Sequence, residues 1–134
     1  MTNRYVQMAL RLVVAAILLP VGYSKLAAGG MDVMLFERLG MEPHGRIIIG
    51  LLEITAGLLM LSPQAASGAL IAVGIMFGAI LAHSTVLGVD VGDGGRHVAM
   101  LTLVLVSSIL VLYARRRDLP IIGTTLGAGD NRDP

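Results

Sequence analysis

The sequence contains no cysteine and no tryptophan, and only 14% of its 134 residues carry a formal charge. Without cysteine, the chain forms no disulfide, thiolate metal site or iron–sulfur cluster of its own, and it performs no thiol catalysis. Its ten basic and nine acidic residues leave a net charge of +1, and the basic residues are not gathered into a recognition face. These absences argue against a nucleic-acid partner, and we assign no metal ligands.

Apolar side chains are what the sequence has in abundance. Hydrophobic residues make up 55% of the chain, which also contains seventeen glycines, and its mean hydropathy is +0.81. This composition is far from that of a water-soluble domain of similar length. The sequence therefore predicts an integral membrane protein that has the lipid bilayer as its surroundings.

Four apolar segments are expected to be membrane-spanning helices. About 20 apolar residues cross a hydrocarbon layer roughly 30 Å thick, and somewhat shorter or longer segments adjust by tilting. The predicted fold is all-α, an integral membrane four-helix bundle formed by residues 1–117, and a polar, disordered cytoplasmic tail follows at 118–134. The expected spans are residues 6–28, 46–62, 65–89 and 97–114.

The first segment has a second interpretation, a cleaved secretory signal. Arg4 and Arg11 precede an apolar core, and the small residues after Leu26 suit a cleavage site. We favour a retained helix, because Lys25 would lie just before that site. Arg11 and Lys25 share one face of this helix at opposite ends. Each cation either extends to the headgroup layer or has a specific partner.

The connection between the first two spans contains signals for a short helix. Asp32 suits an N-cap, Gly40 suits the position after the last turn, and Pro43 prevents continuation. The pattern predicts a short amphipathic helix over residues 33–39, lying on the membrane surface in the first external loop. An irregular loop is the alternative, because the segment is only two turns long.

The second span, IIIGLLEITAGLLML at residues 47–61, contains one carboxylate, Glu53. A charged side chain at the centre of a membrane helix costs about 2.5–3.5 kcal/mol, so a chain that has one usually gives it a partner or a function. Gly50 and Gly57 lie on the same helix face as Glu53, which lets a neighbouring helix approach closely. We therefore ask which group faces Glu53.

The third span is expected to pack through small residues. Gly74, Gly78 and Ala82 recur at every fourth position, the usual pattern of close helix packing in membranes. The loop that follows, GVDVGDGGR at residues 88–96, is rich in glycine but lacks the lysine and the preceding strand of a phosphate-binding loop. It is interpreted as an acidic turn.

The distribution of cations predicts the orientation. With four spans, both termini lie on one side, which carries six cations, and the opposite side carries four. The positive-inside rule then places both termini in the cytoplasm. The six are Arg4, Arg11, Arg115, Arg116, Arg117 and Arg132, and the four are Lys25, Arg38, Arg46 and Arg96.

This topology brings ionisable groups to one level in the outer half of the bundle. Glu53 is expected about 10 Å below the outer end of its span, and His83 about 8 Å below. Lys25 and His97 approach the same level from the first and fourth spans. The four residues form either a polar network that sets helix register or a ligand or proton site, and both interpretations stay open.

The chain also resembles a known family. The segments ALRLVVAAILLPVGYSKL, FERLGMEP, LLEITAGLLML and IMFGAILAHS are similar to successive landmarks of the DoxX family of small four-helix membrane proteins. The family's helix-one arginine, helix-two glutamate and helix-three histidine match Arg11, Glu53 and His83. The resemblance implies a bacterial inner-membrane protein that is associated with a redox system, including quinone reduction. In place of the family's glycine-rich ending this chain has RRRDLP.

Three function classes follow. In the first, the chain is a subunit of a membrane oxidoreductase, catalytic or accessory, whose outer site binds a quinone or relays protons. Glu53 would exchange protons there and His83 would bind a carbonyl group. In the second, it is a scaffold that anchors a protein partner or a second copy of itself. A small-solute carrier is the third. Haem ligation by His83 and His97 is disfavoured, because no other feature shapes a macrocycle pocket.

Overall fold

The structure is a computed structural model that describes residues 3–120. Within them, all regular secondary structure is helical, as the sequence predicts. Residues 121–134 of the predicted tail lie outside the described residues. Of the first residues of this tail, Asp118 ends a 3-10 turn and Leu119 is buried. The elements are α1 (Arg4–Leu26), α2 (Gly30–Arg38), α3 (His44–Met60), α4 (Ala65–Ala82), the π-helical turn η1 (His83–Leu87), α5 (Arg96–Ala114) and the 3-10 turn η2 (Arg116–Asp118).

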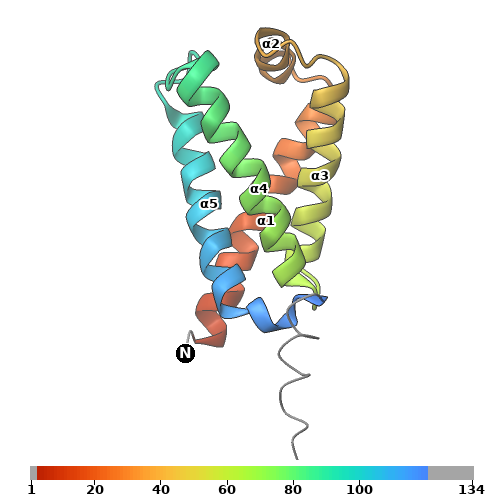
Figure 1. Cartoon of the computed structure of the whole chain (residues 1–134), viewed down its shortest axis with the longest axis vertical. Helices are drawn as coiled ribbons and strands as arrows, with labels where there is room; N and C mark the ends of the chain where they lie inside the picture. Colours follow the sequence, from red (N-terminus) through yellow and green to blue (C-terminus); the bar gives the residue numbers. More distant parts are fainter. Residues whose placement is uncertain (1–2, 121–134) are drawn as a thin grey trace, which may run out of the picture.

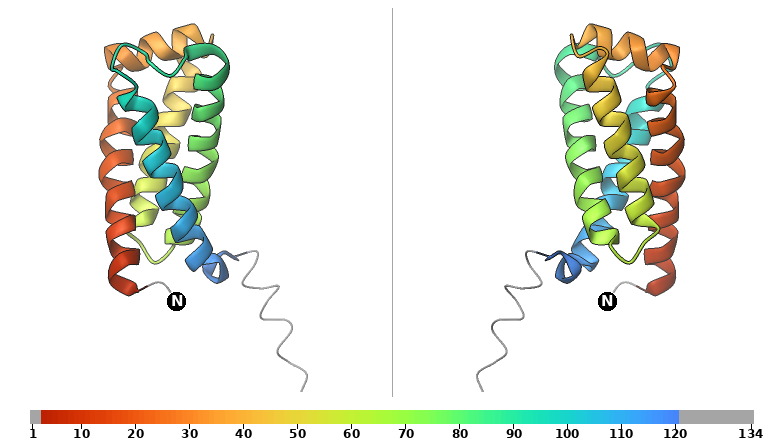
Figure 2. Two further views of the ribbon diagram at one scale, coloured as in Figure 1. Left: turned by 90° about the vertical axis from the view of Figure 1, so that its left-hand side faces the viewer. Right: turned by 90° about the vertical axis from the view of Figure 1, so that its right-hand side faces the viewer.

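The four long helices pack side by side in a ring. Helix α1 contacts α3 and α5, and α4 contacts the same two helices from the other side. The short helix α2 lies across one end of this ring, whereas α1 begins and α5 ends at the other end (Figures 1 and 2). Apolar side chains fill the space between the helices, and the largest fully buried ones are Leu18, Met60, Met76, Val14, Val104 and Val111.

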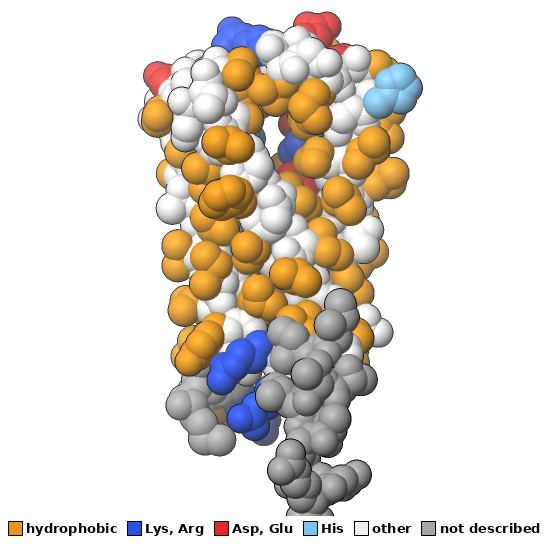
Figure 3. All heavy atoms as spheres, viewed as in Figure 1, with side chains coloured by type: hydrophobic (Ala, Val, Ile, Leu, Met, Phe, Trp, Pro, Cys, Tyr) orange, Lys and Arg blue, Asp and Glu red, His pale blue; other side chains and the backbone are white. Residues whose placement is uncertain are grey.

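Three helices are long and apolar enough to cross a membrane: α1, α4 continued by η1 (Ala65–Leu87), and α5. Helix α3 has 17 residues and rises about 25 Å at 1.5 Å per residue, somewhat less than a hydrocarbon layer of about 30 Å. Large apolar side chains cover the outer surface of the helices (Figure 3). The span predicted for α3 therefore stays a prediction, and the other three meet the length and composition of a span.

Glycines bring α1 and α3 into close contact. A Cβ atom added to Gly22 would lie 2.9 Å from the carbonyl oxygen of Gly50, and one added to Gly50 would lie 3.1 Å from that of Gly22. A Cβ atom on Gly57 would lie 2.8 Å from the Leu19 side chain. The predicted close approach at Gly50 and Gly57 is therefore confirmed, and its partner is α1.

Helices α3 and α4 touch at one end and separate toward the other. A Cβ atom on Gly68 would lie 2.8 Å from the carbonyl oxygen of Ala56, but one on Gly74 or Gly78 would meet no atom within 4 Å. Figure 1 shows the two helices diverging toward α2. Among the described residues, the prediction that Gly74 and Gly78 pack closely against another helix is wrong, because α4 has left α3 before it reaches them. Ala82 is half-buried.

The predicted short helix is present as α2, so the loop alternative is wrong. Gly40 follows its end with φ +68°, and its N–H donates to the carbonyl oxygen of Glu37 at 3.0 Å, as expected for that position. The prediction that Asp32 is the N-cap is wrong. The helix begins earlier, after Gly29, and the Asp32 carboxylate accepts a hydrogen bond from Ser24 instead.

The loop between η1 and α5 is held by two aspartates. Oδ1 of Asp90 accepts hydrogen bonds from the backbone N–H groups of Gly92, Asp93 and Gly94 at 2.9–3.0 Å. These bonds favour the carboxylate and hold the pKa of Asp90 below its usual value. Oδ2 of Asp93 accepts from the N–H of His97 at 2.7 Å and so satisfies the start of α5.

Candidate functional site

Glu53 of α3 faces Lys25 of α1. The Lys25 Nζ atom lies 3.1 Å from Oε1 and 3.0 Å from Oε2 of Glu53, and the two residues are only 6% and 2% exposed. The close approach of Gly22 and Gly50 places the two side chains within reach across the helix interface. The partner that the isolated carboxylate requires is thus a buried ammonium group.

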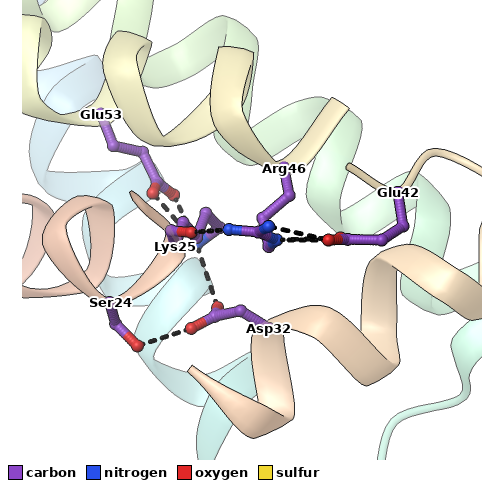
Figure 4. A network of polar contacts seen from close by, with 6 residues as sticks. All are labelled: Ser24, Lys25, Asp32, Glu42, Arg46 and Glu53. Atoms are coloured by element: carbon purple, nitrogen blue, oxygen red, sulfur yellow. Dashed lines mark hydrogen bonds and ion pairs between the residues drawn. The ribbon is translucent and has the colours of Figure 1, made fainter. Parts of the chain in front are cut away.

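A second carboxylate approaches the same ammonium group from α2. Asp32 Oδ1 lies 3.7 Å from Lys25 Nζ, and Ser24 Oγ donates to Asp32 Oδ2 at 2.6 Å. Lys25 therefore connects α1, α2 and α3, as Figure 4 shows. Two carboxyl groups thus share one cation here.

Arg46, at the start of α3, extends this network. Its guanidinium group binds the Glu42 carboxylate, with Nη2 and Nε 2.8 and 2.9 Å from Oε1, and its Nη1 donates to the carbonyl oxygen of Lys25 (Figure 4). The second contact places a cation at the C-terminal end of α1, where the helix dipole favours positive charge. Sequence reasoning missed this pair, although a separation of four residues between Glu42 and Arg46 is a recognised signal.

His83 and His97 form a second polar group near the first. His83 Nδ1 lies 2.7 Å from the carbonyl oxygen of Gly88. Because a carbonyl oxygen only accepts hydrogen bonds, Nδ1 has the proton and Nε2 of the neutral ring is an acceptor. The ring centroids of the two histidines are 5.2 Å apart and the rings are tilted by 44°. Because the two rings are this close to each other, a porphyrin does not fit between them. This disfavours a haem that is bound by both histidines.

All four predicted polar residues line one cavity of about 260 Å³. Lys25 and Glu53 contribute charged groups, and His83 and His97 contribute imidazole rings. The rest of its wall is apolar and comes from α2, α3, α4, η1 and α5. The structure thus brings Lys25, Glu53, His83 and His97 together in one cavity. Among the apolar lining residues are Leu35, Phe36, Leu39, Ile49, Ile75, Ala79, Ala82, Leu87 and Leu101.

The cavity opens sideways between α3 and α4. Gly74 and Gly78 line it and are also exposed on the outer surface, with no side chain to close the space. Figure 3 shows a hollow on this face, below α2, in which charged side chains are visible. The two glycines therefore form a window in the wall of the cavity. The sequence pattern of these glycines predicts close packing, but it does not show whether a helix or an open space lies beside them.

Arg11 lies far from this cavity, near the opposite end of α1. Its Nε donates to the carbonyl oxygen of Met60 at 2.6 Å, and its Nη2 donates to that of Ser62 at 2.8 Å. It thus binds carbonyl groups that the end of α3 leaves unpaired. The interpretation that Arg11 and Lys25 merely extend to the headgroup layers is wrong, because each has a specific partner inside the protein.

Comparison of the chain with models of known families, with curated proteins and with solved structures gives no match. The resemblance to the DoxX family therefore stays a prediction. A function must be inferred from the cavity, the charged groups in it and the way it opens.

Proposed function

We propose that the chain is an integral membrane protein whose cavity binds the ring of a lipophilic, quinone-like ligand, as a subunit of or partner to a membrane redox system. The observation that carries the proposal is the sideways opening of a largely apolar cavity that contains Lys25, Glu53 and two histidines. A ligand dissolved in the bilayer would enter this cavity without passing through water.

The membrane placement rests on the apolar outer surface and on the helix lengths. We propose that all four long helices span the bilayer as a four-helix bundle, with α3 accommodated by local thinning of the lipid layer. The excess of arginines at the end where α1 begins and α5 ends favours the cytoplasmic side for that end. The cavity then lies in the outer half of the membrane.

The size of the cavity suits a single ring. An apolar cavity of about 150 Å³ holds benzene, so about 260 Å³ accommodates a substituted ring but not a long isoprenoid chain. The isoprenoid chain of the ligand would instead extend into lipid through the window at Gly74 and Gly78. Lys25 and the histidines supply polar groups for the oxygen atoms of the ring.

The polar residues are suited to proton exchange. A quinone takes up protons on its oxygens as electrons arrive, and the electrons would come from a redox protein bound to this chain. Two carboxyl groups, those of Glu53 and Asp32, share the one cation Lys25. One of these carboxyl groups would take up a proton and release it again. His83, with Nε2 free to accept, is suited to pass a proton or to hold a hydroxyl group.

A scaffold is the second candidate, and the same window favours it. Gly74 and Gly78 are flanked on α4 by the exposed side chains of Leu70, Phe77 and Leu81. A helix of a partner would find there both small residues for close approach and apolar surface for packing. In that case the partner, and not a ring, closes the opening.

Binding of a short-chain benzoquinone to the purified full-length protein in lipid nanodiscs tests the proposal. We expect saturable binding to the wild type and at least tenfold weaker binding to Gly78→Leu, whose side chain fills the window. Leu81→Ile, an exposed change on the same helix, should bind as the wild type does. Equal quinone binding by Gly78→Leu and Leu81→Ile, together with loss of a co-purifying protein from Gly78→Leu alone, would favour the scaffold.

A further inference from the structure

A second cleft, of about 760 Å³, lies at the other end of the molecule, between the beginning of α1 and the end of α5. Its residues are strongly basic, and none of those described is acidic. Figure 3 shows Lys and Arg side chains gathered at this end. Five arginines line the cleft: Arg4, Arg11, Arg115, Arg116 and Arg117.

Within the described part of the chain, two residues of this cleft have buried polar atoms without a hydrogen-bond partner. They are Nη1 of Arg115 and both amide atoms, Nε2 and Oε1, of Gln7. Nearly all buried polar groups in proteins are hydrogen-bonded, so each exception requires an explanation. A guanidinium nitrogen and an amide that lack partners in one basic cleft indicate a ligand with acceptor oxygens.

The positive charge of the cleft is scarcely neutralised within the described residues. Arg115 pairs with Asp118, at 3.1 Å between Nε and Oδ2. Arg11 donates to neutral carbonyl oxygens, and Arg116 stacks on the ring of Tyr113, with 4.4 Å from Cζ to the ring centroid. Among the described residues, Asp118 is thus the carboxylate that pairs with an arginine of this cleft, and it does so with Arg115 alone. An anion would find several charge-assisted hydrogen bonds here.

The surroundings of the cleft are apolar. Met8 and Tyr113 line it and are exposed, and Leu12 and Leu110, one turn farther along α1 and α5, are about half exposed. A basic cleft whose walls continue into the lipid-facing sides of two candidate spans suits a molecule with a charged head and apolar chains. A soluble anion would make no use of that apolar surface.

We propose that this cleft binds the phosphate headgroup of an anionic phospholipid, with its acyl chains lying along α1 and α5. The proposal rests on the membrane placement proposed above and is independent of the ligand in the other cavity. Arginine is suited to this role because its planar guanidinium group binds two phosphate oxygens at once. Basic clefts at helix ends are recognised binding sites for anionic lipid headgroups.

Lipid binding to the purified full-length protein in neutral detergent tests the proposal. The probes are phosphatidylglycerol, phosphatidylcholine and inorganic phosphate, measured by native mass spectrometry and thermal shift. We expect clear preference for phosphatidylglycerol in the wild type. The double variant Arg4→Gln, Arg117→Gln should bind it about twenty-fivefold more weakly, at roughly fivefold for each arginine near an anionic surface.

Matched controls separate the headgroup site from general charge effects. The double variant Arg38→Gln, Arg96→Gln removes two exposed cations at the opposite end and should keep the affinity of the wild type. Gln7→Leu should weaken phosphatidylglycerol binding at least fivefold while leaving the lipid-free protein as stable as before, because it removes an amide that has no partner. Glu53→Gln should bind this lipid normally, which separates failure here from failure of the quinone proposal.

Three outcomes would overturn the inference. One is equal affinity for phosphatidylglycerol and phosphatidylcholine in the wild type. Another is an unchanged preference in both the Arg4, Arg117 variant and Gln7→Leu. The last is displacement of the lipid by inorganic phosphate at equal concentration, which would identify a site for a soluble anion. Recovery of the protein in solution without detergent would instead refute the membrane placement itself.

Discussion

At the scale of single residues, the structure depends on a buried cation shared among helices. Burying a charge is costly unless it is paired and hydrogen-bonded. Lys25 meets this requirement through Glu53 at 3.0 Å and Asp32 at 3.7 Å. One side chain thereby fixes the relative position of α1, α2 and α3.

The first prediction compares the two members of this ion pair. Lys25→Met should destabilise the protein by about 3–5 kcal/mol, the usual cost of breaking a buried pair, because it leaves Glu53 and Asp32 without their cation. Glu53→Gln should cost less, since Asp32 remains beside Lys25. The double variant Lys25→Met, Glu53→Gln should recover part of the loss. Unfolding of the purified proteins in detergent measures all three.

The control for this prediction is Arg38→Gln, which removes an exposed cation from α2 and should leave the free energy of unfolding within about 0.5 kcal/mol of the wild type. Additive losses in the double variant would contradict the coupling of Lys25 and Glu53. A Glu53→Gln variant as costly as Lys25→Met would show that Asp32 does not support the cation.

At the scale of helices, the glycines of α1 and α3 and those of α4 have two different consequences. Gly22 and Gly50 bring α1 and α3 into backbone contact, whereas Gly74 and Gly78 leave a window beside α4. The difference arises from the path of α4, which touches α3 at Gly68 and then diverges. Spacing within one helix does not contain this information, because it depends on where the neighbouring helix lies.

The second prediction compares Gly22→Ala with Gly78→Ala. The new Cβ atom at position 22 would lie 2.9 Å from the backbone oxygen of Gly50, so α1 and α3 must separate, at a cost of about 1–3 kcal/mol. At position 78 it meets no atom within 4 Å and should stabilise the helix by up to about 1 kcal/mol. Thermal unfolding in detergent should therefore shift in opposite directions. Equal destabilisation by both changes would show that the window is packed in the folded protein.

Apolar runs and glycine or proline signals were sufficient to predict the long helices and α2 to within a few residues. The interaction partners of a side chain on other helices were not predictable from such local signals. Asp32 fits an N-cap by local pattern, yet its position across α1 pairs it with Ser24 and Lys25. Counting residues from the helix ends was sufficient to predict that the four polar residues of the site lie near one another, because the rise of 1.5 Å per residue holds along any helix. The cavity itself depends on the divergence of α3 and α4, which local patterns do not record.

At the scale of the whole molecule, the two ends differ in charge. The end covered by α2 has mixed charges that pair within the protein, such as Arg46 with Glu42. At the end where α1 begins and α5 ends, Arg115 is the described arginine that pairs with a carboxylate, that of Asp118. Under the proposed membrane placement, these arginines favour the cytoplasmic side for this end, because the positive-inside rule counts Lys and Arg near the ends of spans. The same arginines are those that line the basic cleft.

The last prediction decides between four spans and three. Because the chain has no cysteine, single cysteines introduced at Glu37, Val89 and Arg117, all exposed, report their positions without background. If α3 spans the membrane, positions 37 and 89 should react with an impermeant thiol reagent from outside, and position 117 only after the membrane is opened. If α3 does not span, positions 37 and 117 should lie on one side and position 89 on the other. Leu35 is unsuitable for this test because it is buried above the cavity. The second pattern would remove the common depth of Glu53 and His83 in the bilayer, and with it the entry of a ligand from lipid.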